Sequence, residues 1–74
     1  MYLAQKKYHK AIDNFKKATK INPKNDSAWC DMGTAYYNLK NYKKAVNFYN
    51  KAIDLNPDNE DYKKLRDDAL EKMK

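Results

Sequence analysis

The sequence has few of the large aliphatic residues that usually fill a protein core. It contains five Leu, three Ile, one Val and two Phe in 74 residues, while charged residues make up 35% of the chain. This composition is typical of disordered chains. Aromatic residues oppose that interpretation, because they reach 14% with seven Tyr, and disordered segments are usually poor in aromatics. The order of the residues therefore decides whether the chain folds, and its length allows one small domain at most.

Glycine and cysteine each occur once, and each scarcity excludes a class of site. A single glycine, Gly33, cannot build a phosphate-binding loop, which needs several glycines for close backbone approach. The lone Cys30 excludes an internal disulfide framework and is typical of a reducing compartment. No apolar run approaches the length of a membrane span, and the start does not resemble a secretion signal. We therefore predict an intracellular, cytoplasmic protein without a membrane-spanning helix.

Histidine and serine also occur once each, at His9 and Ser27. Together with Cys30 they provide neither a convincing nucleophile and base nor the four ligands of a structural metal site. The sequence therefore predicts a protein that is not an enzyme and needs neither a metal nor a cofactor.

An internal repeat gives the chain its organisation. Shifting the sequence by 34 residues aligns Tyr and Ala residues as well as the two Asn-Pro pairs, which lysine-rich composition alone would not do. The aligned pairs include Tyr8 with Tyr42, Ala11 with Ala45, Ala18 with Ala52, Asn22-Pro23 with Asn56-Pro57, and Asn25 with Asn59.

Apolar residues within the repeat have helical spacing. Ala45, Tyr49 and Ala52 fall on one face of a helix, and a second stripe of helical spacing begins at Ala28. We expect helices at about 26–39 and 42–55 in a complete unit, 26–59. We expect residues 1–25 to form a truncated preceding unit that consists mainly of one helix at about 8–21. Residues 60–74 are expected to form a polar C-terminal capping helix. Lys6 and Lys40 occupy the expected left-handed turn positions.

Trp29-x2-Met32-Gly33-x2-Tyr36, followed by Ala45-x3-Tyr49-x2-Ala52-x4-Pro57, resembles the tetratricopeptide repeat. Met32 replaces the Leu of that pattern, and Tyr49 replaces its Phe. The resemblance implies an all-α fold in which helix-turn-helix repeats form a short right-handed solenoid. The residues that carry this signature in the complete and the truncated unit are Trp29, Met32, Gly33, Tyr36, Ala45, Tyr49, Ala52, Pro57, Ala11, Phe15, Ala18 and Pro23.

The same resemblance implies a non-enzymatic scaffold or adaptor that binds a peptide of another protein in a concave groove. Co-chaperones are among the adaptors of this kind. Mapped residue by residue, the candidate groove consists of Ser27, Cys30, Asp31, Thr34, Tyr37, Asn38, Lys64 and Asp68, with Asp61 and Leu65 beside them. A simpler interpretation is that these are solvated residues of a spacer repeat.

Some co-chaperones of this family clamp a C-terminal carboxylate with Asn, Lys and Arg residues. Here Asp31 stands at an Asn position, and Asp61 and Leu65 stand at the Lys and Arg positions. A carboxylate would meet Asp31 as a like charge. We therefore expect this chain alone not to bind such a tail.

Net charge is concentrated at one end of the chain. Residues 1–25 contain seven Lys and one Asp, which accounts for the whole net charge of +6. The lysine-rich face of residues 10–24 is an alternative contact surface for nucleic acid or an acidic partner, although a solvated face is more usual. A further alternative is a self-associating fragment without a ligand, because the first unit is incomplete and about three repeats usually make a stable stack.

Overall fold

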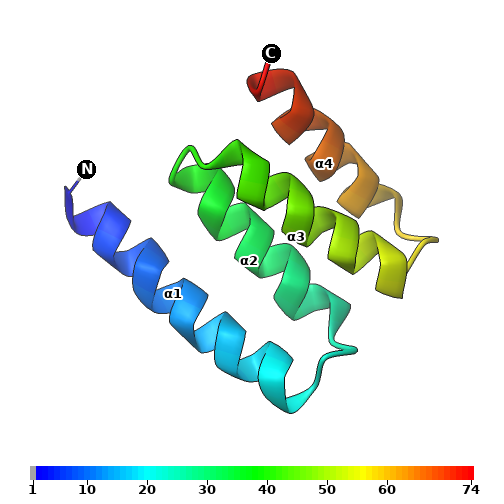
Figure 1. Cartoon of the computed structure of the whole chain (residues 1–74), viewed down its shortest axis with the longest axis horizontal. Helices are drawn as coiled ribbons and strands as arrows, with labels where there is room; N and C mark the ends of the chain where they lie inside the picture. The colour runs from blue at the N-terminus through cyan, green and yellow to red at the C-terminus, as the bar shows by residue number, and fades with distance from the viewer. Residues whose placement is uncertain (1) are drawn as a thin grey trace.

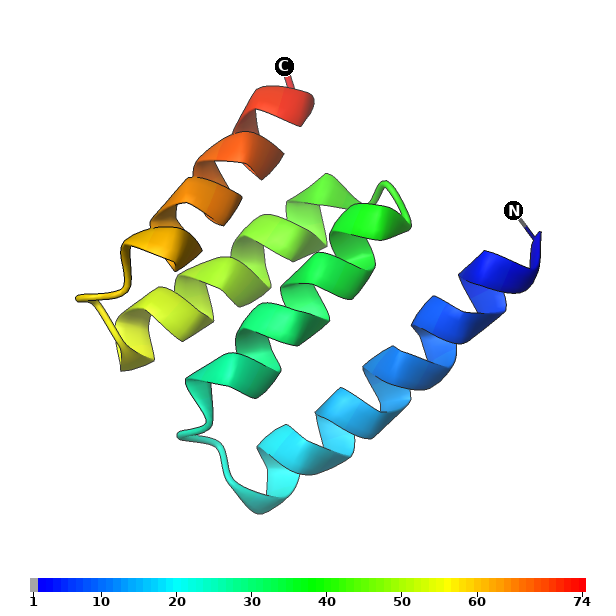
Figure 2. The ribbon, with the colours of Figure 1, turned by 180° about the vertical axis from the view of Figure 1, so that it is seen from behind.

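The computed structural model contains four α-helices, and it describes the backbone of residues 2–74 and the side chains of residues 7–74. The helices are α1 (Tyr2–Ile21), α2 (Asp26–Asn38), α3 (Tyr42–Leu55) and α4 (Glu60–Lys72). Each packs mainly on the next one in the chain, so the helices form a row from α1 to α4 (Figure 1) that is seen from behind in Figure 2. The row is a thin slab with principal extents of 36 × 34 × 15 Å. The predicted all-α fold is confirmed.

Asparagine side chains begin three of the helices. The side chain of Asn25 accepts a hydrogen bond from the backbone N–H of Ala28 at 3.2 Å, and Asn41 accepts one from Lys44 at 3.4 Å. Asn59 caps α4 by accepting bonds from the N–H groups of its first turn. These side chains satisfy amide groups that have no partner within the helix.

The turn between α2 and α3 is closed by a lysine in the left-handed conformation. Lys40 has φ 65°, as predicted. Its N–H donates to the carbonyl of Tyr37, and the N–H of Asn41 donates to that of Tyr36, both at 2.9 Å. This is the hydrogen-bond pattern that usually contains glycine at the left-handed position.

The prediction for the start of α1 is wrong. The helix begins at Tyr2, not near residue 8, and Lys6 lies inside it instead of in a turn. The repeat offset places Lys7 where Asn41 caps α3, so no side chain of the Asn type begins a new helix at that point. Leu3 to Lys7 are also good helix formers, so continuing the helix avoids the cost of a left-handed lysine. A smaller correction applies to α2, which ends at Asn38 with Leu39 as its C-cap residue.

Gly33 allows α2 and α3 to approach closely. A Cβ atom at this position would lie 2.8 Å from ring atoms Cδ1 and Cε1 of Tyr49 and 3.2 Å from the carbonyl oxygen of Ala45. Tyr49 is only 1% exposed, and Ala45 and Ala52 are fully buried. Small residues and one tyrosine therefore replace the missing large aliphatics along this contact.

Aromatic rings extend the contact between α2 and α3. Trp29 and Tyr36 both stack on Phe48, with centroid distances of 5.9 and 5.3 Å. Lysines of α3 lie over the same two rings: Lys51 Nζ is 5.6 Å from the centroid of the Trp29 ring, and Lys44 Nζ is 5.3 Å from that of the Tyr36 ring.

The other signature residues take different positions. Met32 and Tyr36 are buried, whereas Ala11, Phe15 and Ala18 on α1 are only partly buried. Pro23 and Pro57 are exposed in the turns that follow α1 and α3, so they limit helices and do not fill the core. The carbonyl of Pro23 accepts a hydrogen bond from Trp29 Nε1 at 2.9 Å.

Candidate functional site

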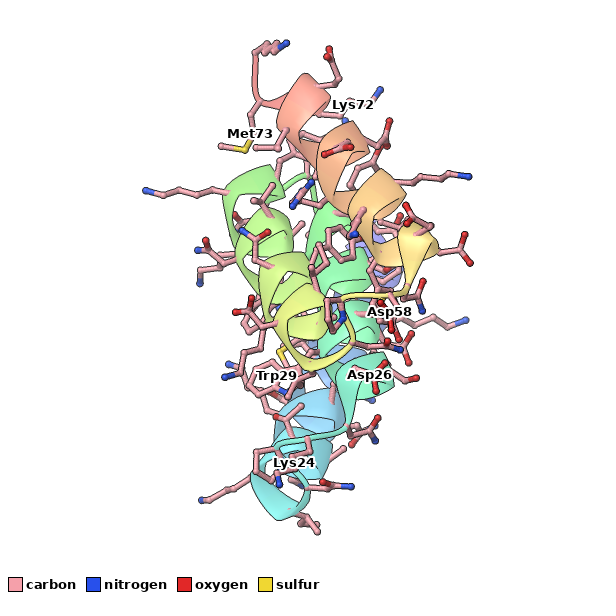
Figure 3. The ribbon with its side chains drawn as sticks, turned by 90° about the vertical axis from the view of Figure 1, so that its right-hand side faces the viewer. Lys24, Asp26, Trp29, Asp58, Lys72 and Met73 are labelled. Atoms are coloured by element: carbon pink, nitrogen blue, oxygen red, sulfur yellow. The ribbon has the colours of Figure 1, made fainter. Side chains whose placement is uncertain are left out.

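Hydrogen bonds join α2 to α4 near both ends of the contact between them. At the start of both helices, Tyr62 donates from its hydroxyl to Asp26 Oδ2 at 2.8 Å. Asn56 Nδ2, from the turn between α3 and α4, donates to the same oxygen at 3.3 Å. Toward the other end, the Tyr37 hydroxyl donates to Asp68. In Figure 3, Asp26 and Trp29 point to opposite sides of α2, Asp26 toward the side of α4 and Trp29 toward that of α3.

The predicted groove residues belong to α2 and α4. On α2, Ser27, Asp31 and Asn38 are exposed. Lys64 and Asp68 on α4 are exposed as well. We call these five residues the α2–α4 face.

Three of the predicted groove residues, Cys30, Thr34 and Tyr37, make contacts within the protein itself. Cys30 is 8% exposed and belongs to the core cluster, so the expectation that its side chain lines a groove is corrected. Burial, followed by the nearby charge of Asp31, raises the pKa of the Cys30 thiol to about 11. The Thr34 hydroxyl donates to the Cys30 carbonyl at 3.2 Å and lies 3.0 Å from the hydroxyl of Tyr49. Tyr37 is partly buried by its contacts with Asp68 and with the ring of Tyr42.

A family model described as tetratricopeptide repeat matches residues 2–69. The chain belongs to the tetratricopeptide repeat family. Repeats of this family are generally protein–protein interaction modules and are typically non-catalytic. No curated protein matches the chain.

The division of this tetratricopeptide chain into units 1–25, 26–59 and 60–74 stays a prediction. Within the part of the chain that the structure describes, no group of three or more His, Cys, Asp or Glu residues could hold a metal ion. No helix in the described ranges is long and apolar enough to cross a membrane.

Asp26 and Tyr62 connect two tetratricopeptide helices in a way that sequence reasoning missed. Neither residue is among the candidate site residues that the sequence indicates. The pKa of the Asp26 carboxyl is lowered mainly by the hydrogen bond that Tyr62 donates to it. Partial burial acts in the opposite direction and raises this pKa, but the lowering is larger. Burial is the main cause that raises the pKa of Tyr62.

The lowered pKa of Asp26 predicts a loss of stability in acid. A carboxyl group whose pKa is lower in the folded state contributes stability above its unfolded pKa of about 4, and this contribution is lost as the pH falls through the folded value. Urea unfolding measured from pH 7 to pH 2 should therefore show a smaller acid-induced loss in Asp26→Asn than in the unchanged chain. Asp54→Asn, at an exposed position of α3, is the matched control and should keep the full pH dependence. Equal pH dependence in the unchanged chain and Asp26→Asn would contradict the prediction.

Proposed function

We propose that the α2–α4 face binds a peptide segment of a partner protein. The observation that carries this proposal is the connection of α2 to α4 through Asp26–Tyr62 and Tyr37–Asp68. Two helices held at both ends present their remaining side chains at fixed separation, so a ligand needs to order little of the protein when it binds.

The charges of the α2–α4 face favour a basic peptide. Asp31, Asp68 and the neighbouring Asp61 are all exposed, and Lys64 is the one cation among the candidate groove residues of the two helices. The ion pairs among the described residues do not include these three aspartates. They join Lys63 to Glu60, Arg66 to Asp67, and Lys74 to Glu71. Three exposed carboxylates on these two helices attract lysine and arginine side chains and repel a free C-terminal carboxylate.

Fluorescence anisotropy with two matched peptides tests this proposal. One labelled peptide has lysine at alternate positions, and its counterpart has glutamate at the same positions. We expect the lysine peptide to bind more tightly and to weaken as salt is added. In Asp31→Lys its affinity should fall about fivefold, because reversing this charge should cost roughly 1 kcal/mol of binding free energy.

The control variant is Asp54→Lys, which makes the same charge change at an exposed position of α3. It should bind the lysine peptide nearly as well as the unchanged chain does. Preference for the glutamate peptide, or an equal loss of affinity in the two variants, would show that the α2–α4 face is not the binding surface.

A further inference from the structure

Charged residues are divided unequally between alternate helices. α1 contains six Lys and one Asp, and α3 contains three Lys and one Asp. By contrast, α2 contains two Asp and no basic residue, and α4 contains five acidic and four basic residues. Within the part of the chain that the structure describes, no ion pair includes a lysine of α1 or α3. The positive charge of these two helices is therefore available to a ligand.

Most of the positive charge of α1 lies on the side that points away from its buried residues, Ile12 and Thr19. Six exposed residues at helical spacing share this side. We call them the outer face of α1: His9, Lys10, Asp13, Lys16, Lys17 and Lys20. The outer face of α1 contains four lysines, one aspartate and no apolar residue.

The corresponding side of α3 is exposed although helices pack on both sides of α3. Both α2 and α4 contact this helix, yet the six positions that follow the outer face of α1 by 34 residues are all exposed. Exposure of the outer face of α1 therefore does not depend on what lies beside α1. The residues at these positions form the outer face of α3: Lys43, Lys44, Asn47, Asn50, Lys51 and Asp54.

A hollow between α1 and α3 joins the two outer faces. It encloses about 380 Å³, and its lining residues are His9, Tyr36, Leu39, Asn41 and Lys44. The side-chain oxygen of Asn41 accepts a hydrogen bond from the backbone N–H of Lys44, so the amide nitrogen of Asn41 can donate to a ligand. His9, Asn41 and Lys44 therefore provide hydrogen-bond donors around one space, as a phosphate group requires.

The two outer faces favour a ligand with dense and regular negative charge. Neither face contains an apolar residue, Tyr, Trp or Arg, which are the usual anchors of a protein–protein interface. An exposed ion pair with a single carboxylate contributes little in water. A nucleic acid differs, because each lysine that contacts a phosphate releases a condensed counterion, and this gain needs no anchor.

The aromatic rings beside these lysines are engaged within the protein. Lys44 lies over the ring of Tyr36 and Lys51 over that of Trp29, and both rings stack on Phe48. Proteins that bind single strands usually offer aromatic rings on which the bases stack. The outer faces therefore suit the backbone of a duplex, whose bases are already stacked on one another.

We propose that the outer faces of α1 and α3 bind the phosphate backbone of double-stranded nucleic acid without sequence preference. One phosphate lies in the hollow beside His9, Asn41 and Lys44, and the lysines of α1 contact further phosphates. Lys10 to Lys20 extend over about 15 Å of α1, which is about the axial length of four nucleotides of one strand. The contact therefore comprises about four phosphates.

Two other anionic partners fit the outer faces less well. In a second copy of the chain, acidic residues of α4 are already paired with Lys63 and Arg66, which weakens their attraction for a lysine-rich face. A helix that binds a membrane surface inserts apolar side chains, and the outer faces have none.

Fluorescence anisotropy with a labelled DNA duplex of about 20 base pairs, measured over a salt series, tests the proposal. The logarithm of the binding constant should fall with the logarithm of the salt concentration with a slope of about −3 to −4, as expected for about four phosphate contacts. Lys16→Gln, Lys20→Gln and Lys44→Gln should each weaken binding about two- to fivefold and make the slope less steep by about one. A duplex of another sequence should bind equally well, and a single strand of the same length more weakly.

The matched control is Lys72→Gln, which removes the same charge at an exposed position of α4. It should keep the affinity and the slope of the unchanged chain, and circular dichroism verifies that every variant folds. No binding of the duplex at low salt, or an equal loss of affinity in Lys72→Gln, would overturn the proposal. Unchanged affinity in Lys44→Gln would also overturn it, because the hollow would then hold no phosphate.

Three competing ligands complete the test. Binding that is tighter to the single strand, to polyglutamate or to vesicles containing phosphatidylserine than to the duplex would overturn the proposal as well. Lys16, Lys20 and Lys44 all lie outside the α2–α4 face, so failure of this test is distinguishable from failure of the proposed peptide binding.

Discussion

Replacing Gly33 by valine should remove a large part of the stability of the fold. The first added atom would already lie 2.8 Å from two ring atoms of Tyr49, and the ring is almost fully buried, so it cannot move aside without separating α2 from α3. Overpacking of this kind costs about 1–3 kcal/mol, and a branched side chain should be at or above the top of that range. A chain of this length has roughly 4–11 kcal/mol in total, so the change should be plain in urea unfolding followed by circular dichroism.

Two further variants identify the contact as the cause. Asn47→Val introduces the same residue at an exposed position of α3 and should cost well under about 1 kcal/mol. In a chain that already carries Tyr49→Ala, the valine at position 33 should cost much less, because the ring that it would strike is absent. A full, additive loss in the double variant would show that Tyr49 does not set the requirement for glycine.

Replacing Tyr62 by alanine should detach α4 from the rest of the fold. Tyr62 is 8% exposed and, with Ala69, is one of two buried residues of this helix. Removing a buried aromatic side chain costs about 3–5 kcal/mol in a core, and little else in α4 could compensate. Amide hydrogen exchange should show protection lost over α4 before it is lost over α2, and urea unfolding should show the lower stability.

Tyr62→Phe separates burial from hydrogen bonding in this helix. It keeps the ring but removes the hydroxyl that donates to Asp26, so it should cost about 1 kcal/mol and leave α4 in place. If the phenylalanine variant loses as much stability as the alanine variant, the hydrogen bond would hold α4 and the buried ring would not.

The core could be predicted from the sequence because the 34-residue offset compares each position with an equivalent one. Gly33 and Tyr49 are informative as a pair, since a small residue at one helical face requires a large residue opposite. The continuation of α1 through Lys6 could not be predicted in the same way. The repeat makes Lys6 equivalent to Lys40, but the neighbouring residue decides the outcome: Asn41 can cap a helix, and Lys7 cannot.

The candidate site was less predictable than the core, for a geometric reason. Ser27, Asp31 and Asn38 share a helix face by spacing alone, which a sequence shows directly. The contacts of Asp26 with Tyr62 and of Tyr37 with Asp68 join residues more than thirty positions apart. They depend on the angle and separation of α2 and α4, which no local pattern encodes. The burial of Cys30 likewise follows from the way the helices pack around the core cluster to which it belongs.

The packing of each helix mainly on its chain neighbour also bears on how the protein folds. Contacts that join α1 to α2, α2 to α3 and α3 to α4 span short stretches of sequence, because only a few residues separate one helix from the next. Little chain entropy is lost in closing such short loops. Proteins whose contacts are local fold in microseconds to milliseconds, so this chain would spend little time with its tyrosine-rich surfaces exposed to other molecules.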